Sequence, residues 1–168
     1  QYYEQAREMG AALAREGYTS IVVATGAPVP RELQLEGSGI RVVDALDFLA
    51  QSRVTKGAHD ACRAVVVTGG GNTAMDAARV AARLPGRPAV TILYRRTRAE
   101  MPADREEFAA ALADGAAYEE LSLPVGMVPG KGGGLPVLRV REMTLGKPDA
   151  SGRRAPVPTE RVRELPCD

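Results

Sequence analysis

The chain is poor in several residue types that build common functional sites. Its 168 residues include no tryptophan, one histidine and two cysteines, and aromatic side chains make up 4% of the sequence. Cys62 and Cys167 stand far apart, so we expect neither a disulfide framework nor a metal site. The single histidine, His59, lies in a polar stretch, and we expect it on the surface in contact with solvent.

Long apolar runs and a strong charge imbalance are also missing. No stretch approaches the roughly eighteen consecutive apolar residues of a membrane-spanning helix. The net charge is +1, and we therefore expect neither a nucleic-acid partner nor a membrane partner. The N-terminal residues are charged and have helical periodicity, unlike a signal peptide, which favours a cytoplasmic location. Apolar residues make up 45% and charged residues 26%, as in ordinary globular proteins.

The first third of the chain predicts a few separate elements. Residues 1–16 have the spacing of a helix, residues 18–27 that of a buried strand, and residues 42–53 that of a short helix. The polar stretch 56–63 is typical of a linker, and we place the main domain boundary near residue 58. Both ends of the sequence look cut, so we interpret it as a piece of a longer polypeptide.

The middle of the chain alternates strands and helices. We expect strands over residues 64–68, 89–96 and 116–123, and helices over 72–84 and 103–114. This order predicts an α/β fold of the doubly wound, Rossmann-like type, in which the parallel strands are joined by right-handed crossovers. The apolar run at 64–68 suits a strand that is covered on both faces.

Beyond residue 124 the pattern changes to antiparallel strands. Glycines 132–134 predict a hairpin turn, residues 135–145 an alternating strand, residues 146–159 a long polar connection, and residues 161–165 a last strand. We expect these strands to form an antiparallel β-meander that crosses over one side of the parallel sheet.

A glycine-rich turn separates the strand at 64–68 from the helix that follows. Gly69, Gly71 and Ala74 match the dinucleotide pattern G-x-G-x-x-G/A in the strand–turn–helix context that makes it informative. Gly69 permits the tight turn, Gly71 lets a pyrophosphate approach the backbone, and Ala74 lets helix and strand lie close. The alternative is a glycine turn that binds nothing. The residues expected at the pyrophosphate are Gly69, Gly70, Gly71, Asn72, Thr73 and Ala74.

Two arginines at the end of the next strand indicate which dinucleotide is bound. A protein that binds NAD usually has an acidic residue there, bonded to the ribose 2′-hydroxyl. This chain has Arg95 and Arg96 instead, and the next acid is Glu100. Paired guanidiniums suit a 2′-phosphate, which favours NADP(H). The alternative is that both arginines only solvate the strand end.

Three segments carry a resemblance to a known family. GGGNTAMDAAR (69–79), YRRTRAEMPA (94–103) and LGKPDASGRRAPVP (145–158) resemble the NADPH-binding domain of glutamate synthase small subunits and of the N-terminal part of dihydropyrimidine dehydrogenase. The likeness is greatest to selenate reductase subunits. The stretch Ala24–Gly26 is similar to the Ala-Thr-Gly segment that ends the FAD domain in these flavoproteins. The likeness covers nearly the whole chain.

The resemblance implies a part of an enzyme. Residues 1–58 would be a remnant of an FAD domain with its connector, and residues 59–168 an NADP(H)-binding domain truncated at both ends. NADPH would pass a hydride to FAD, and electrons would continue through iron–sulfur clusters, with FAD and clusters held by partner domains or subunits. We expect no catalytic residue in this chain and no activity of the fragment alone. The alternative is a module that senses a dinucleotide without redox turnover.

Overall fold

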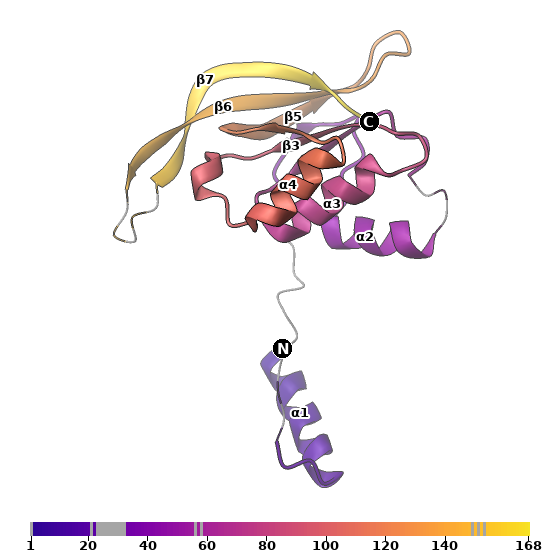
Figure 1. Ribbon diagram of the computed structural model, residues 1–168, viewed down its shortest axis with the longest axis vertical. Helices are drawn as coiled ribbons and strands as arrows, with labels where there is room; N and C mark the ends of the chain where they lie inside the picture. The colour runs from indigo at the N-terminus through magenta and orange to yellow at the C-terminus, as the bar shows by residue number, and fades with distance from the viewer. Residues whose placement is uncertain are drawn as a thin grey trace. The chain divides into compact units, whose positions relative to one another are not determined.

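The computed structural model describes residues 2–20, 22, 33–55, 57, 59–148, 150, 152 and 154–168. The chain divides into two compact units, Gln1–Glu32 and Leu33–Asp168. Helix α1, Tyr2–Arg15, lies in the first unit and confirms the helix predicted there (Figure 1). Most of the strand predicted over residues 18–27, including the stretch Ala24–Gly26, falls outside the described residues.

The second unit contains the predicted parallel sheet. Its strand order is β2-β3-β4, and both neighbouring pairs are parallel. This order confirms the alternation of strands and helices read from the sequence. The strands are β2 (Ala64–Thr68), β3 (Ala89–Leu93) and β4 (Ala117–Glu119), and the connecting helices are α3 (Asn72–Ala82) and α4 (Arg105–Ala113).

A second sheet has the order β1-β5-β6-β7. The short strand β1 runs parallel to β5. The pairs β5–β6 and β6–β7 are antiparallel, which confirms the expected meander. The short helix predicted over residues 42–53 is also present. The strands are β1 (Glu36–Gly37), β5 (Ser122–Val128), β6 (Val137–Pro148) and β7 (Arg154–Pro166), and the helix is α2 (Ala45–Val54).

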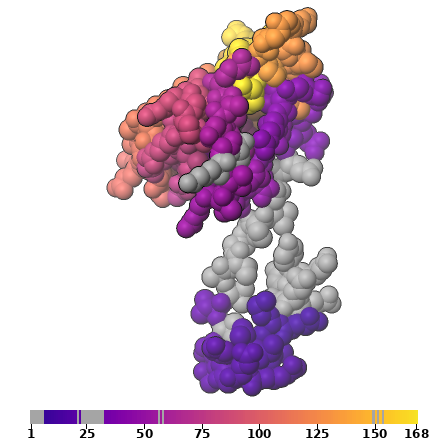
Figure 2. All heavy atoms as spheres, turned by 90° about the vertical axis from the view of Figure 1, so that its right-hand side faces the viewer, coloured from indigo at the N-terminus to yellow at the C-terminus, as the bar shows by residue number. Residues whose placement is uncertain are grey.

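The parallel sheet is covered on both faces, as its apolar strands predicted. Val65, Val67 and Ile92 pack in a core with α3 and α4, whereas Val66 and Leu93 pack in a second core with residues of β6. Successive side chains of a strand point to opposite faces, so two short strands serve both cores. Figure 1 shows the helices on one side of β3 and the meander on the other. Leu35 and Ile40, on either side of β1, pack in the second core with Leu165 and Cys167. Figure 2 shows purple spheres of the early part of this unit beside the yellow C-terminal end.

Two sequence predictions need correction. Residues 116–123 do not form one strand: Glu119 ends β4, Leu121 has φ 52, and β5 begins at Ser122 in the other sheet. A leucine at positive φ turns the chain sharply, so the two halves of the segment belong to different sheets. The long polar connection predicted over 146–159 is also wrong. Strand β6 continues to Pro148 and β7 already begins at Arg154, so most of that stretch is paired strand.

Candidate functional site

The three glycines of the turn between β2 and α3 have different surroundings. Gly69 has φ 144, and a Cβ there would lie 3.2 Å from Cβ of Ala74. A Cβ on Gly70 would lie 2.5 Å from Cε2 of the Tyr94 ring. A Cβ on Gly71 would meet no heavy atom within 4 Å. The first two glycines are therefore required by backbone geometry and packing inside the protein, whereas the third faces open space.

Helix α3 begins without a side-chain cap. Its N-cap residue is Gly71, whose carbonyl accepts hydrogen bonds from the amides of Ala74 at 3.0 Å and Met75 at 3.3 Å. Within the described ranges, the backbone N–H groups of Gly71, Asn72 and Thr73 have no hydrogen-bond acceptor. Free amides at the positive end of a helix dipole attract anions. This end of α3 therefore offers donors to a phosphate group.

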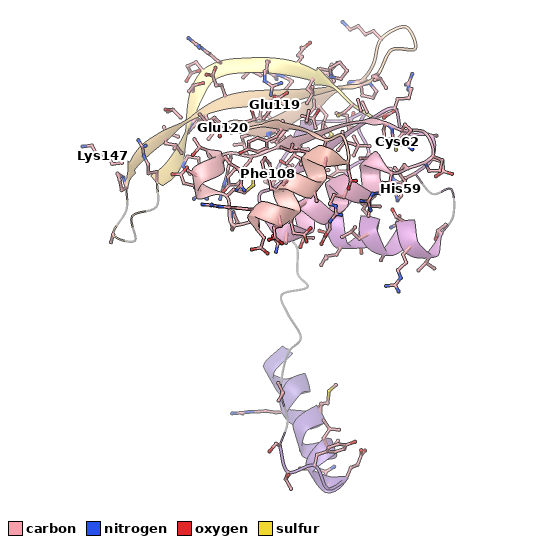
Figure 3. The ribbon with its side chains drawn as sticks, in the orientation of Figure 1. His59, Cys62, Phe108, Glu119, Glu120 and Lys147 are labelled. Atoms are coloured by element: carbon pink, nitrogen blue, oxygen red, sulfur yellow. The ribbon has the colours of Figure 1, made fainter. Side chains whose placement is uncertain are left out.

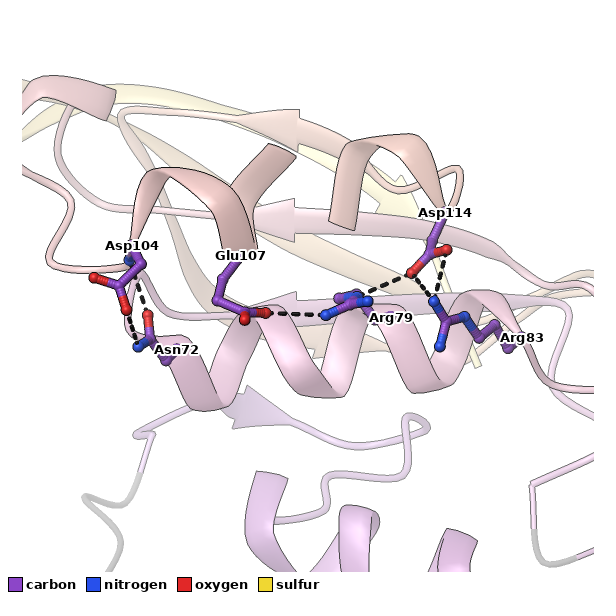
Figure 4. A network of polar contacts seen from close by, with 6 residues as sticks. All are labelled: Asn72, Arg79, Arg83, Asp104, Glu107 and Asp114. Atoms are coloured by element: carbon purple, nitrogen blue, oxygen red, sulfur yellow. Dashed lines mark hydrogen bonds and ion pairs between the residues drawn. The ribbon is translucent and has the colours of Figure 1, made fainter. Parts of the chain in front are cut away.

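Asn72 forms a reciprocal pair with Asp104, at the start of α4. Its Nδ2 donates to Oδ2 of Asp104 at 2.8 Å, and its Oδ1 accepts from the backbone N–H of Asp104 at 2.9 Å (Figure 4). The sequence placed Asn72 and Thr73 among the residues expected at the pyrophosphate, where their side chains could also donate to a phosphate. One of the two amide hydrogens of Asn72 is already engaged, and the side chain of Thr73 is exposed.

The glycine turn and the two arginines lie at the same edge of the parallel sheet. Thr68, the last residue of β2, is paired in register with Leu93, the last residue of β3. The N–H of Gly69 donates to the carbonyl of Leu93 at 3.0 Å. Because the strands are parallel neighbours, the residues that follow them, the turn after β2 and Arg95 and Arg96 after β3, are brought together.

The arginines differ in their surroundings. Arg95 is exposed and, in the described part of the chain, makes no hydrogen bond or ion pair. Arg96 is half-buried, and its Nε donates to the backbone carbonyl of Arg154 at 3.1 Å, at the start of β7. Its two terminal nitrogens donate to no acceptor among the described residues. The guanidinium of Arg98 lies 4.3 Å from the ring centre of Phe108, a cation–π contact.

The next acidic residue along the chain, Glu100, has its carboxylate bonded to Thr97. Glu100 accepts hydrogen bonds from Oγ1 of Thr97 at 3.0 Å and from the Thr97 amide at 3.3 Å, which forms a capping box around the short helix Arg98–Glu100. The sequence T-R-A-E matches the capping-box pattern. The first carboxylate that follows β3 in the sequence is therefore already bonded to Thr97.

Charged residues fix α3 against α4. Arg79 donates to Asp114 and to Glu107, both at 3.0 Å, and Arg83 donates to both oxygens of Asp114 (Figure 4). The bonds from Arg83 and Arg79 lower the pKa of Asp114. The bond to Asp114 in turn raises the pKa of Arg79. Together with the pair formed by Asn72, this network connects the helices along their length.

His59 corrects another expectation. His59, labelled in Figure 3, is only 6% exposed. Its ring centre lies 4.8 Å from that of Phe48 on α2. Burial lowers the pKa of His59, and the nearby charge of Arg41 lowers it further. The polar sequence around His59 suggested an exposed side chain. The histidine is buried because Phe48, on the preceding helix, packs against its ring.

The neighbouring carboxylates Glu119 and Glu120 do not act as a pair. Glu119 pairs with Arg163, whereas Glu120 accepts from the backbone N–H of Arg98 at 2.7 Å, so the two carboxylates have different partners (Figure 3). Asp76 is exposed. Arg153 falls outside the described residues.

Comparisons with known proteins show which sequences and folds this chain resembles. The family model described as pyridine nucleotide-disulphide oxidoreductase matches residues 5–126. YgfK of Escherichia coli (strain K12), which is named as an oxidoreductase, is 41% identical over 160 residues, covering 93% of this chain and 14% of that protein. The NADPH glutamate synthase small chain of Azospirillum brasilense is 35% identical over 168 residues, covering 92% of this chain and 34% of that protein. The predicted resemblance to glutamate synthase small subunits is thereby confirmed.

A solved structure shares the fold. FprA of Mycobacterium tuberculosis, in complex with NADPH, superimposes with a TM-score of 0.65 at 18% identity, covering 92% of this chain and 49% of that one. At this identity the likeness shows the fold alone. The chain thus spans about a third or less of the two curated relatives and about half of this structural neighbour. No helix in the described part of the chain is long and apolar enough to cross a membrane.

Proposed function

Because this chain belongs to the pyridine nucleotide-disulphide oxidoreductase family, we propose that it is the NADPH-binding module of a multidomain oxidoreductase that passes a hydride from NADPH to FAD. The single observation that supports this most is the register of β2 and β3, which brings an uncapped helix start and two arginines to one sheet edge. Pyrophosphate and 2′-phosphate lie in one NADPH molecule, so one edge with both kinds of donor suits it.

The turn fits the pyrophosphate. The free amides of Gly71, Asn72 and Thr73 would donate to its oxygens, and the open space at Gly71 leaves room for their approach. Gly69 and Gly70 shape the turn, and Ala74 keeps α3 close to β2. These are the residues that the sequence pattern indicated for this role.

The arginines fit the 2′-phosphate. Arg95 has no partner among the described residues, and the terminal nitrogens of Arg96 are unused. A guanidinium stays charged at every physiological pH and can donate two parallel hydrogen bonds to a phosphate. Glu100, the next acid in the sequence after β3, is bonded to Thr97, and we do not expect it to bind the ribose. The site therefore favours NADPH over NADH.

Bound NADPH would supply the hydride, and the residues of this chain would only hold and orient it. No side chain near the turn is proposed as acid, base or nucleophile. FAD and iron–sulfur clusters would be held by the FAD domain and the iron–sulfur domain or subunit of the parent protein. We propose residues 1–58 as a remnant of the FAD domain with its connector, and residues 59–168 as the NADP(H)-binding domain.

A dinucleotide sensor without redox turnover is the second candidate. The full-length gene product distinguishes the two. An enzyme should carry bound flavin, absorb in the visible range, and oxidise NADPH in the presence of an artificial electron acceptor. A sensor should bind NADPH but remain colourless and redox-silent.

The direct test is calorimetric titration of the chain with NADPH and with NADH at the same fixed salt concentration. Two charge-assisted contacts to the 2′-phosphate should favour NADPH by at least about tenfold. Equal affinities would contradict the role of the arginines. No measurable binding of either nucleotide would contradict the proposed function.

A further inference from the structure

The segment that leads from β3 into α4 braces the glycine turn by three contacts. The ring of Tyr94 lies against Gly70, and the N–H of Ala103 donates to the Gly70 carbonyl at 2.9 Å. The third contact is the reciprocal pair between Asn72 and Asp104. The sequence pattern of the turn contains none of these three bracing residues.

Asp104 has an unusual role for its position. It is the N-cap residue of α4, with φ −58 and ψ 145, yet its side chain makes no hydrogen bond to the amides of its own helix. Aspartate at this position ordinarily accepts a hydrogen bond from the second or third residue of the helix. Here the carboxylate reaches Asn72 instead, on a neighbouring helix. The carboxylate of Asp104 therefore bonds to the glycine turn through Asn72 and does not cap its own helix.

The charge of Asp104 shows that this side chain cannot favour phosphate binding by direct contact. A carboxylate repels phosphate, so Asp104 would weaken dinucleotide binding if its charge acted alone. It also cannot donate to a phosphate oxygen while ionised. A favourable effect on binding can therefore reach the ligand only through Asn72 and the first turn of α3.

We propose that Asp104 is a positioning residue for the dinucleotide pyrophosphate, which acts by fixing Asn72 and with it the free amides at the start of α3. This inference rests on the proposed function. The pyrophosphate is common to NADPH and NADH, so Asp104 affects both nucleotides equally. In this respect it differs from Arg95 and Arg96, which act on the 2′-phosphate only.

The test uses two substitutions in the 168-residue chain. Asp104→Asn removes the charge but keeps an oxygen that can accept from Asn72. Asp104→Ser is too short to keep that bond in its present geometry, but serine is a good N-cap and can bond the amides of α4. Asp104→Thr offers the same cap and replaces the serine variant if that variant does not fold. Asp114→Asn, at the other end of α4, is the control for a general disturbance of the helix.

Affinity for NADPH and NADH is measured by calorimetry, and stability by urea unfolding. Asp104→Ser should weaken the binding of both nucleotides by about threefold to tenfold, the value of one hydrogen bond, and should not lower stability. Asp104→Asn should bind within about twofold of the unaltered chain, or more tightly. Asp114→Asn should lower stability and leave both affinities unchanged.

The outcomes separate the inference from the function. If Asp104→Ser binds both nucleotides as tightly as Asp104→Asn, the positioning role is refuted and the proposed function is untouched. If it weakens NADPH alone, Asp104 acts through the 2′-phosphate and the inference is also wrong. If the unaltered chain binds neither nucleotide, the proposed function itself fails.

Discussion

Addition of a methyl group should affect different properties at the adjacent residues Gly70 and Gly71. At Gly70 it should lower the stability of the fold, and at Gly71 it should lower the affinity for NADPH. In Gly70→Ala the new Cβ would lie 2.5 Å from Cε2 of Tyr94, whereas carbon atoms in contact are about 3.5–4.0 Å apart. The Tyr94 ring is 6% exposed, and its hydroxyl donates to the carbonyl of Glu100 at 2.9 Å, so it cannot move without breaking other contacts. Overpacking of this kind costs about 1–3 kcal/mol of folding free energy.

Gly71→Ala meets no such obstacle in the protein. No heavy atom lies within 4 Å of the new Cβ, and φ −96 with ψ 171 is accessible to any residue. The loss of folding free energy should stay below about 1 kcal/mol, the usual range for a change at an N-cap. The methyl group would instead stand where the pyrophosphate approaches, so NADPH affinity should fall by about tenfold or more.

The assay compares both variants with the unaltered chain. Urea unfolding followed by circular dichroism gives the free energy of unfolding, and calorimetry gives the NADPH affinity. The double variant Gly70→Ala with Tyr94→Leu provides a control, because a smaller side chain at position 94 should relieve part of the clash and make the two changes non-additive.

Two results would refute this reasoning. If Gly71→Ala were as destabilised as Gly70→Ala, the space beside Gly71 would not be open. If Gly71→Ala bound NADPH as tightly as the unaltered chain, the pyrophosphate would not approach the backbone there.

Two further predictions concern Arg96 and His59. Arg96→Ala should weaken NADPH binding by about tenfold to a hundredfold and leave NADH binding unchanged, because a charge-assisted bond contributes roughly 1.5–3 kcal/mol; equal losses in calorimetry would contradict the assignment. For His59, the folded pKa lies below the ordinary value of 6.5, so between those two values the unfolded chain binds a proton that the folded chain does not. The contribution of His59 is therefore fully present above pH 6.5 and is lost as the pH falls below it. Urea unfolding at about pH 7.5 and about pH 5.5 should show a decrease that is smaller in His59→Phe; an equal decrease would mean that other groups cause it.

Local sequence patterns were sufficient to predict the parallel sheet and the helices that connect its strands. The apolar run at Ala64–Thr68 and the alanine-rich helix after it are marked by periodicity and by glycine, so their ends follow from nearby residues. The division of residues 116–123 between two sheets depends on Leu121, a residue type that carries no turn signal. The polar segment at 146–159 looked like a connection because β7 is an edge strand with exposed, charged residues. Only pairing with β6 identifies it as a strand.

Some residues of the candidate site could also be predicted from the sequence, whereas others could not. Gly69, Gly71 and the two arginines follow from a motif whose spacing reflects the shape of the ligand. Tyr94 and Asp104 could not be found by that route, because their contacts with Gly70 and Asn72 arise only when β3 and α4 pack beside the turn. His59 was misjudged for the same reason, since its packing partner is supplied by α2.

The segment from Tyr94 to Asp104 connects the two halves of the proposed NADPH site. Its first residue packs on Gly70 and its last binds Asn72, so both of its ends are fixed to the glycine turn. Arg95 and Arg96 lie within the same segment, and Arg96 is also held by the carbonyl of Arg154 on the meander. In the proposed site, one short segment fixed at both ends would therefore set the separation between the donors to the pyrophosphate and the donors to the 2′-phosphate. Such preorganisation would lower the entropy lost on NADPH binding, because the ligand would not have to order the donors.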